Sequence, residues 1–294
     1  MMQKIFLLVT LAFFSMCLSN CASSLRRDSD AVVSASILPL GYFIDRLTDG
    51  SLAVNVMVPP GASHATYSPT AEQFRKLADS GIYFRIGHLG YEQAWIGRLQ
   101  EINPNMLVVN LSEGLDLIRG EEIDHGDHVH EGGIDPHIWM SPAVMLTLLP
   151  EIKNAIIAAY PELAEVVNEN YTSFYNDLAV LDTEMQTLTA SLSQKRFMIF
   201  HPALTYLARD YGLEQIAVER GGKEPSPATL SHIIRQARQH QIPVIFIQQE
   251  FDLRSAELIS METGAKLVQI NPLAYEWFES MQELMQVFKT YLSE

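Results

Sequence analysis

Residues 161–202 read PELAEVVNENYTSFYNDLAVLDTEMQTLTASLSQKRFMIFHP, and this segment indicates how the rest of the chain is organised. Between Pro161 and Pro202 it contains no glycine and no other proline, and Pro161 with Glu162 behind it suits the first turn of a helix. Apolar residues recur in it at helical spacing: Leu163, Val166, Val167, Tyr171, Phe174, Leu178, Leu181, Met185 and Leu188. The spacing predicts one helix of about 30 residues, about 45 Å long, ahead of a buried strand.

Short apolar runs alternate with helix-like segments on both sides of this predicted helix. Four runs precede it, at residues 31–37 (AVVSASI), 54–58 (VNVMV), 82–86 and 106–109, and helical patterns lie between them at residues 40–47 and 70–79. Four more follow, at residues 197–200 (FMIF), 215–218 (QIAV), 244–247 (VIFI) and 266–270 (KLVQI), with a helical pattern at residues 228–240. Such alternation predicts parallel sheets with helices on both faces.

The predicted fold class is therefore α/β, with two lobes that each hold a parallel sheet flanked by helices. A long rigid backbone helix joins the lobes and would limit hinge motion between them. We expect the N-terminal lobe at residues 31–140, connecting helices at residues 141–195 and the C-terminal lobe at residues 196–294.

The first residues predict export. Lys4 is followed by an uncharged apolar run from residue 5 to residue 18, which suits a signal-peptide core and is short for a membrane span. The run ends in Leu18-Ser19-Asn20-Cys21, which looks like a bacterial lipobox with Asn20 as its one departure. We expect a signal peptide at residues 1–20, lipidation of Cys21, a tether at residues 21–30, and a periplasmic or cell-surface lipoprotein. The alternative is an ordinary cleaved signal with an incidental cysteine.

Composition narrows the classes of partner and of metal site. The formal net charge is −15 over 294 residues, which argues against nucleic acid as a partner. Cys17 and Cys21 are the only cysteines, and both lie in the export segment. The mature domain is therefore expected to have no disulfide and no thiolate metal ligand.

Three of the nine histidines lie where strands or turns would present them to a ligand. His201 directly follows the predicted strand FMIF, and ligands of open α/β sheets bind at the carboxyl ends of strands. His64 lies in a loop rich in glycine and proline after the strand VNVMV. His137 lies in residues 135–142 (DPHIWMSP), just before a helix start predicted at Ser141, and Asp135 could hold its other ring nitrogen.

Neutral imidazoles favour zinc, copper, nickel or cobalt over calcium or magnesium. Without cysteine, a site of His64, His137 and His201 with one oxygen donor suits Zn²⁺. The candidate oxygen donors are Glu250, after the strand VIFI and two glutamines, and Asn271, after the strand KLVQI.

The other histidines are expected to lie outside this site. His125, His128 and His130 fall in residues 121–133 (EEIDHGDHVHEGG), which we predict to be a flexible, accessory metal-binding loop. His232 and His240 fall on a predicted amphipathic helix and are expected at the surface, and His88 is expected in a turn.

A metal-dependent hydrolase is the alternative from another functional class. It would need an open coordination position and a general base. The sequence contains no HExxH helix, no GxSxG elbow and no glycine-rich phosphate loop. We therefore expect no enzymatic activity.

The assembled motifs resemble those of the zinc and manganese solute-binding proteins of bacterial ABC importers, from Val33 to the C-terminus. In chain order the motifs are residues 59–63 (PPGAS), 67–70 (YSPT), 135–142 (DPHIWMSP), His201 with 206–208 (YLA), 224–227 (EPSP) and 271–273 (NPL). The DPHxWxSP block is the most specific of them. The resemblance implies two α/β lobes joined by a long rigid helix, with the metal bound between them.

The resemblance also implies a set of ligands. His137 and His201 match the family pattern directly, and His201 indicates the zinc branch because a carboxylate usually replaces it in the manganese branch. The first ligand of the family falls at Ala65 in an ungapped match, and His64 occupies the neighbouring position. The fourth is usually the aspartate of an Asp-Pro-Leu turn, where this chain has Asn271, and Glu250 could replace it. An acidic, histidine-rich loop like residues 121–133 is typical of the zinc branch.

The sequence thus predicts a receptor that captures Zn²⁺, with Mn²⁺ as the alternative, and delivers it to an ABC permease and its ATPase subunit. We expect a monomer, anchored to the membrane by its lipid. A manganese or iron receptor and an adhesin-like protein are the alternatives with the same fold.

Overall fold

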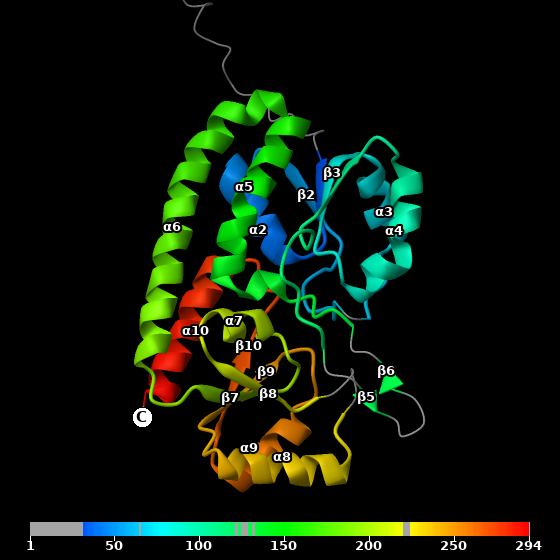
Figure 1. The fold of residues 1–294 in the computed structure, drawn as a ribbon. Helices are drawn as coiled ribbons and strands as arrows, with labels where there is room; N and C mark the ends of the chain where they lie inside the picture. Colours follow the sequence, from blue (N-terminus) through cyan, green and yellow to red (C-terminus); the bar gives the residue numbers. More distant parts are fainter. Residues whose placement is uncertain are drawn as a thin grey trace, which may run out of the picture. The chain divides into compact units, whose positions relative to one another are not determined.

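The computed structural model describes residues 32–64, 66–120, 123–124, 129–130, 133–219 and 224–293. The predicted signal peptide, Cys21, the tether, Ala65, His125 and His128 lie outside these residues. Within residues 32–293 the chain forms two parallel sheets with helices packed on them (Figure 1).

The first half of the chain forms a four-stranded parallel sheet in the order β2-β1-β3-β4. Its strands are β1 (Val32–Ala35), β2 (Ala53–Val56), β3 (Ser80–Arg85) and β4 (Leu107–Asn110). The intervening helices are α2 (Leu38–Thr48), α3 (Ala71–Ala78) and α4 (Gly90–Ile102). All four predicted strands are confirmed, and their carboxyl ends share one edge because the pairing is parallel.

Residues 121–133, which we predicted to be a loop, contain a short antiparallel pair. This pair joins β5 (Ile123–Asp124) to β6 (Val129–His130). An isolated bridge between Arg119 and Ile134 closes the base of the segment.

The second half repeats the architecture with the strand order β10-β9-β7-β8, again parallel. Its strands are β7 (Arg196–Ile199), β8 (Glu214–Ala217), β9 (Val244–Gln248) and β10 (Lys266–Ile270). Its helices are α7 (Thr205–Asp210), α8 (Pro227–Gln239), α9 (Arg254–Thr263) and α10 (Trp277–Leu292). The predicted α/β class with two parallel sheets is confirmed.

The predicted long helix is α6 (Ala164–Ser191), with 28 residues, preceded by one 3₁₀ turn at η2 (Pro161–Leu163). It packs against α2 and α5 of the first half and against α10 of the second half, as Figure 1 shows. Arg46 on α2 forms an ion pair with Asp177 on α6 at 2.9 Å, and Tyr211 donates a hydrogen bond to Asp182 on α6 at 2.7 Å. One helix therefore braces both sheets.

The two halves also share an apolar core. The rings of Phe43 on α2 and Trp277 on α10 lie 5.1 Å apart, and Phe174 on α6 lies 5.0 Å from Phe43. The helix α5 (Pro142–Ala159) is long and apolar enough to span a membrane by length and composition. It carries Met145, Leu149 and Ile156 into this core and packs along α6, so we interpret it as a core helix. Continuous packing of this kind resists large rotations between the halves.

Candidate metal centre

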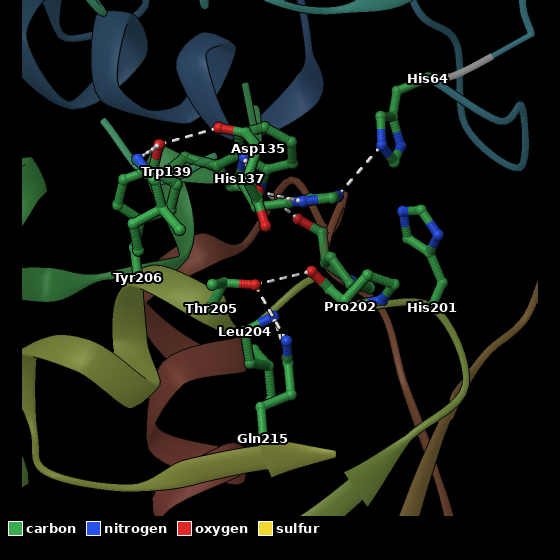
Figure 2. Close-up of polar contacts among 12 residues, drawn as sticks. His64, Asp135, His137, Trp139, His201, Pro202, Leu204, Thr205, Tyr206 and Gln215 are labelled. Atoms are coloured by element: carbon green, nitrogen blue, oxygen red, sulfur yellow. Dashed lines mark hydrogen bonds and ion pairs between the residues drawn. The ribbon is translucent and has the colours of Figure 1, made fainter. Parts of the chain in front are cut away.

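Three histidines from distant parts of the chain converge on one point (Figure 2). His64 comes from the loop between β2 and α3, and His137 from the turn before the 3₁₀ helix η1 (Ile138–Met140). His201 is the second residue after β7. One ring nitrogen from each lies within 4.8 Å of the other two. The ring centroids are 4.9 Å apart for His64 and His137, 5.1 Å for His137 and His201, and 5.5 Å for His64 and His201. The structure thus brings together the three histidines predicted from the sequence.

The spacing of the nitrogens suits a single tetrahedral ion. The Nε2 atoms of His64 and His137 are 3.1 Å apart. Two nitrogens bound to one tetrahedral Zn²⁺ at about 2.0–2.1 Å lie about 3.3–3.4 Å apart. These two rings would need to separate by only a few tenths of an ångström to share the ion.

Asp135 holds His137 in the orientation that a metal ligand needs. Its Oδ1 atom accepts the backbone N–H of His137 at 2.9 Å and lies 2.8 Å from His137 Nδ1. A proton on Nδ1 leaves the lone pair of Nε2 directed at the other two rings. Burial lowers the pKa of His137, although Asp135 partly opposes this, so the ring is neutral at pH 7. The predicted role of Asp135 is confirmed.

His201 has a corresponding carboxylate partner, which the sequence analysis did not identify. Glu219, at the carboxyl end of β8, places Oε2 2.9 Å from His201 Nδ1. Gln248 holds the backbone of His201 from the other side, since it accepts from the amide at 3.3 Å and donates to the carbonyl at 2.7 Å. The ring of Phe251 stacks on His201 at 5.3 Å. His201 Nε2 is buried and has no hydrogen-bond partner among the described residues, as a nitrogen reserved for a metal would be.

The signal for Glu219 was available in the sequence. It is the second residue after β8, whose carboxyl end lies beside that of β7. The strand-end rule that identified His201 applies equally to Glu219.

His64 differs from the other two ligand candidates. It is 5% exposed, and its Nδ1 atom has no hydrogen-bond partner among the described residues. Burial lowers the pKa of His64 well below its usual range, and the neighbouring rings of His137 and His201 lower it further. This ring is therefore neutral, and nothing in the described protein anchors its outer nitrogen.

The candidates for a fourth ligand are less directly placed. Glu250 is half-buried and close enough to His201 to interact with it electrostatically, but it is not part of the 4.8 Å cluster. Burial raises the pKa of Glu250, and His201 partly offsets this. Asn271 is exposed, and its side-chain oxygen accepts the amide of Leu273 at 3.1 Å. A turn therefore already uses the amide oxygen that we proposed as a ligand.

The remaining described histidines lie outside the cluster, as expected. His232 is exposed on α8. His240, which we expected at the surface, is half-buried at the C-cap of that helix near Arg196. His88 follows Gly87 in a turn. Of the histidine-rich segment, His130 lies in β6, and only its backbone is described.

Comparison with known proteins agrees with this geometry. The family model for the periplasmic zinc-uptake complex component A, ZnuA, matches residues 33–291. The chain belongs to this family. The predicted resemblance to zinc-type solute-binding proteins of ABC importers is thereby confirmed.

Individual members of the ZnuA family match along most of the chain. A crystal structure of ZnuA superposes with a TM-score of 0.81 at 30% identity, over 90% of this chain and 99% of that one. The high-affinity zinc uptake system protein ZnuA of Bacillus subtilis is 26% identical over 250 residues, which cover 82% of this chain and 78% of the relative.

Other relatives differ in length or share only the fold. The zinc-binding lipoprotein AdcA of Streptococcus pneumoniae is 26% identical over 285 residues, 92% of this chain. The match covers 56% of AdcA, so the chain spans little more than half of that relative. The laminin-binding protein Lmb of Streptococcus agalactiae shares the fold, with a TM-score of 0.77 at 21% identity over 89% of this chain and 99% of that one.

Proposed function

We propose that this protein is the exported receptor of a zinc importer of the ABC type, and that it binds Zn²⁺ through His64, His137 and His201. The observation that carries the proposal is the convergence of three imidazoles, two buried and one partly buried, with ligand nitrogens within 4.8 Å of one another. The relatives ZnuA of Bacillus subtilis and AdcA of Streptococcus pneumoniae, named for zinc uptake and zinc binding, support the same cargo. The receptor delivers the ion to a permease with its ATPase subunit and performs no chemical step.

Nitrogen donors favour zinc over the alternative manganese cargo. Mn²⁺ prefers carboxylate, carbonyl and water oxygens, whereas imidazole suits Zn²⁺. The cluster of three histidines contains no oxygen ligand. A water molecule or Glu250 completes the four-coordinate shell.

Two further parts of the proposal rest mainly on residues that the structure does not describe. Cys21 carries the lipid that anchors the receptor to a membrane. His125 and His128, together with His130 of β6, form an accessory segment that gathers metal without contributing to the main site.

The hydrogen bonds around His137 suggest how the ion is released. Asp135 accepts a hydrogen bond from Tyr206 of α7 at 2.8 Å through its carbonyl. The indole of Trp139 donates to the carbonyl of Pro272 at 2.8 Å, and that of Trp277 donates to the carbonyl of Trp139 at 2.8 Å. The segment that carries His137 is thereby fastened to the half of the chain that carries His201.

Of the three histidines, His64 is then the one supplied by a separate element, the loop after β2. Its Nδ1 atom has no hydrogen-bond partner among the described residues. Movement of this loop alone would open the shell while His137 and His201 keep their positions. Release of Zn²⁺ therefore needs a loop displacement and no large rotation of the two halves.

Competitive titration of the purified protein tests the proposal. With a chromophoric chelator at pH 7, the protein should bind one Zn²⁺ more tightly than Mn²⁺, and His137→Ala should weaken binding. Tighter binding of Mn²⁺ would contradict the zinc assignment. Turnover of simple ester or phosphate substrates that is lost in His137→Ala would replace the receptor by a hydrolase.

A further inference from the structure

In two of the three candidate ligands, the ring nitrogen that faces away from the cluster, Nδ1, is hydrogen-bonded to a buried carboxylate. Asp135 lies 2.8 Å from His137 Nδ1, and Glu219 lies 2.9 Å from His201 Nδ1. The side chains of the two acids are 9% and 4% exposed, respectively. They come from separate parts of the fold, the turn before η1 and the end of β8. One short motif therefore cannot account for both.

We infer that Glu219 is a positioning residue for His201, as Asp135 is for His137, and that both acids add negative charge beside a bound divalent ion. The inference rests on the proposed function, in which the three histidines hold the metal. It goes beyond that function because it assigns ligand orientation and a nearby negative charge to a residue that does not touch the ion.

The two acids place negative charge beside the ion. Three neutral imidazoles carry no charge, so a buried Zn²⁺ would bring two positive charges into the site. Asp135 and Glu219 each contribute one negative charge behind a ligand, and the half-buried Glu250 lies near His201. Buried positive charge without negative partners is unfavourable. These acids therefore favour a divalent ion over a monovalent one.

The sheet fixes the position of Glu219 relative to His201. The amide of Glu219 donates to the carbonyl of Phe200 at 2.9 Å, which continues the pairing of β7 with β8 up to the metal site. The carboxylate is thus held beside the ring of the next residue, His201. Gln248 on the opposite neighbour, β9, fixes the His201 backbone. Ring and backbone are held from different strands, so His201 Nε2 can face only the cluster.

The arrangement assigns different roles to the three ligands. His137 and His201 each have a carboxylate that orients the ring and makes its metal-binding nitrogen more basic. His64 has no such partner among the described residues. The two anchored rings retain the ion, and the unanchored ring closes over it.

Substitution of Glu219 separates charge from orientation. Glu219→Gln keeps a hydrogen-bond acceptor for Nδ1–H and removes the charge, while Glu219→Ala removes both. Loss of a carboxylate behind a metal-binding histidine typically weakens metal affinity about 10–100-fold. We expect about 10-fold weaker Zn²⁺ binding in Glu219→Gln and a larger loss, up to about 100-fold, in Glu219→Ala.

Glu214→Gln is the matched control. Glu214 begins the same strand, is 55% exposed, and pairs with Arg196 at the opposite end of β8 from the site. This variant should bind Zn²⁺ within about 2-fold of wild type, since surface ion pairs contribute little. Circular dichroism and the melting temperature of the metal-free proteins show whether each variant folds.

Nitrogen NMR of the imidazoles gives a readout that a merely structural role would not change. In the zinc-bound wild type, His201 should be protonated at Nδ1 and coordinated through Nε2. In Glu219→Ala, the NMR signal of the Nδ1 proton should weaken, or the proton should exchange with solvent faster. If Glu219→Ala does not fold, the zinc affinity of Glu219→Gln and the NMR spectrum of the wild type still test the inference.

Wild-type affinity in a folded Glu219→Gln, or coordination of zinc through Nδ1 of His201, would overturn the inference. Either result would leave the proposed function intact. Failure of wild-type protein to bind Zn²⁺ would instead refute the function itself.

Discussion

Alanine substitutions of His64 and His137 should both weaken zinc binding and should change folding stability differently. A zinc site with four protein ligands binds with about 10–16 kcal/mol, or roughly 3 kcal/mol per ligand. Each substitution should therefore weaken Zn²⁺ binding roughly 100-fold.

The metal-free proteins should separate the two variants. His137→Ala leaves the buried Asp135 without the ring donor at 2.8 Å, which costs about 1–3 kcal/mol of unfolding free energy. His64→Ala removes a ring whose Nδ1 has no partner among the described residues, and burial of that ring already carries a desolvation cost. We expect its unfolding free energy to stay within about 1 kcal/mol of wild type.

Chelator competition measures the affinities, and urea denaturation of the metal-free proteins measures the stabilities. Wild-type zinc affinity in His64→Ala would refute the idea that His64 is a ligand. Equal destabilisation of the two metal-free variants would refute the distinction between an anchored and an unanchored histidine.

Folding lowers the pKa values of His64 and His137, so the unfolded chain takes up protons more readily than the folded protein. The folding stability is therefore highest above about pH 6.5 and falls as the pH drops below that value. In pH titrations, the stability of the metal-free protein and its zinc affinity should decline together in this range. Gly87→Ala should lower the melting temperature markedly, because the glycine has a φ of +108° and a Cβ there would lie 2.2 Å from the Asn110 side chain. Arg46→Ala should lower the unfolding free energy by about 1–2 kcal/mol without changing zinc affinity in the same titration. It removes the partly exposed ion pair with Asp177, the hydrogen bond to Tyr42 and the contact with the Phe174 ring, and none of these lies at the metal site.

Much of the fold could be predicted because buried parallel strands are continuous apolar runs. The strand at residues 266–270 coincides with β10, and the others differ by one or two residues at their ends. The long helix was readable because no glycine or proline interrupts it. Only its first turn differs, since Pro161–Leu163 form a 3₁₀ turn.

The packing between the two halves could not be read from the sequence. Nothing in the pattern around Trp139 indicates that its indole bonds to Pro272, more than 100 residues away. Pairing of this kind depends on how two sheets dock, which periodicity within one segment does not report. The expected end of the N-terminal lobe near residue 140 therefore gave no hint that the His137 turn is fastened to the second half.

The site was predicted unevenly for a similar reason. His137 and His201 stand in recognisable motifs or at strand ends, and His64 was found as a neighbour of the expected position. Glu219 and Gln248 are single polar residues near strand ends, and the same residue types are common on solvated surfaces. Only the fold places their side chains against His201.

The coordination sphere of zinc, in a crystal of the protein loaded with one equivalent of Zn²⁺, tests the proposed site most directly. We expect Zn²⁺ bound by the Nε2 atoms of His64, His137 and His201 at about 2.0–2.1 Å, with Asp135 and Glu219 behind two of the rings. An ion held by the carboxylates of Asp135 or Glu219, or a shell from which His64 is absent, would contradict it.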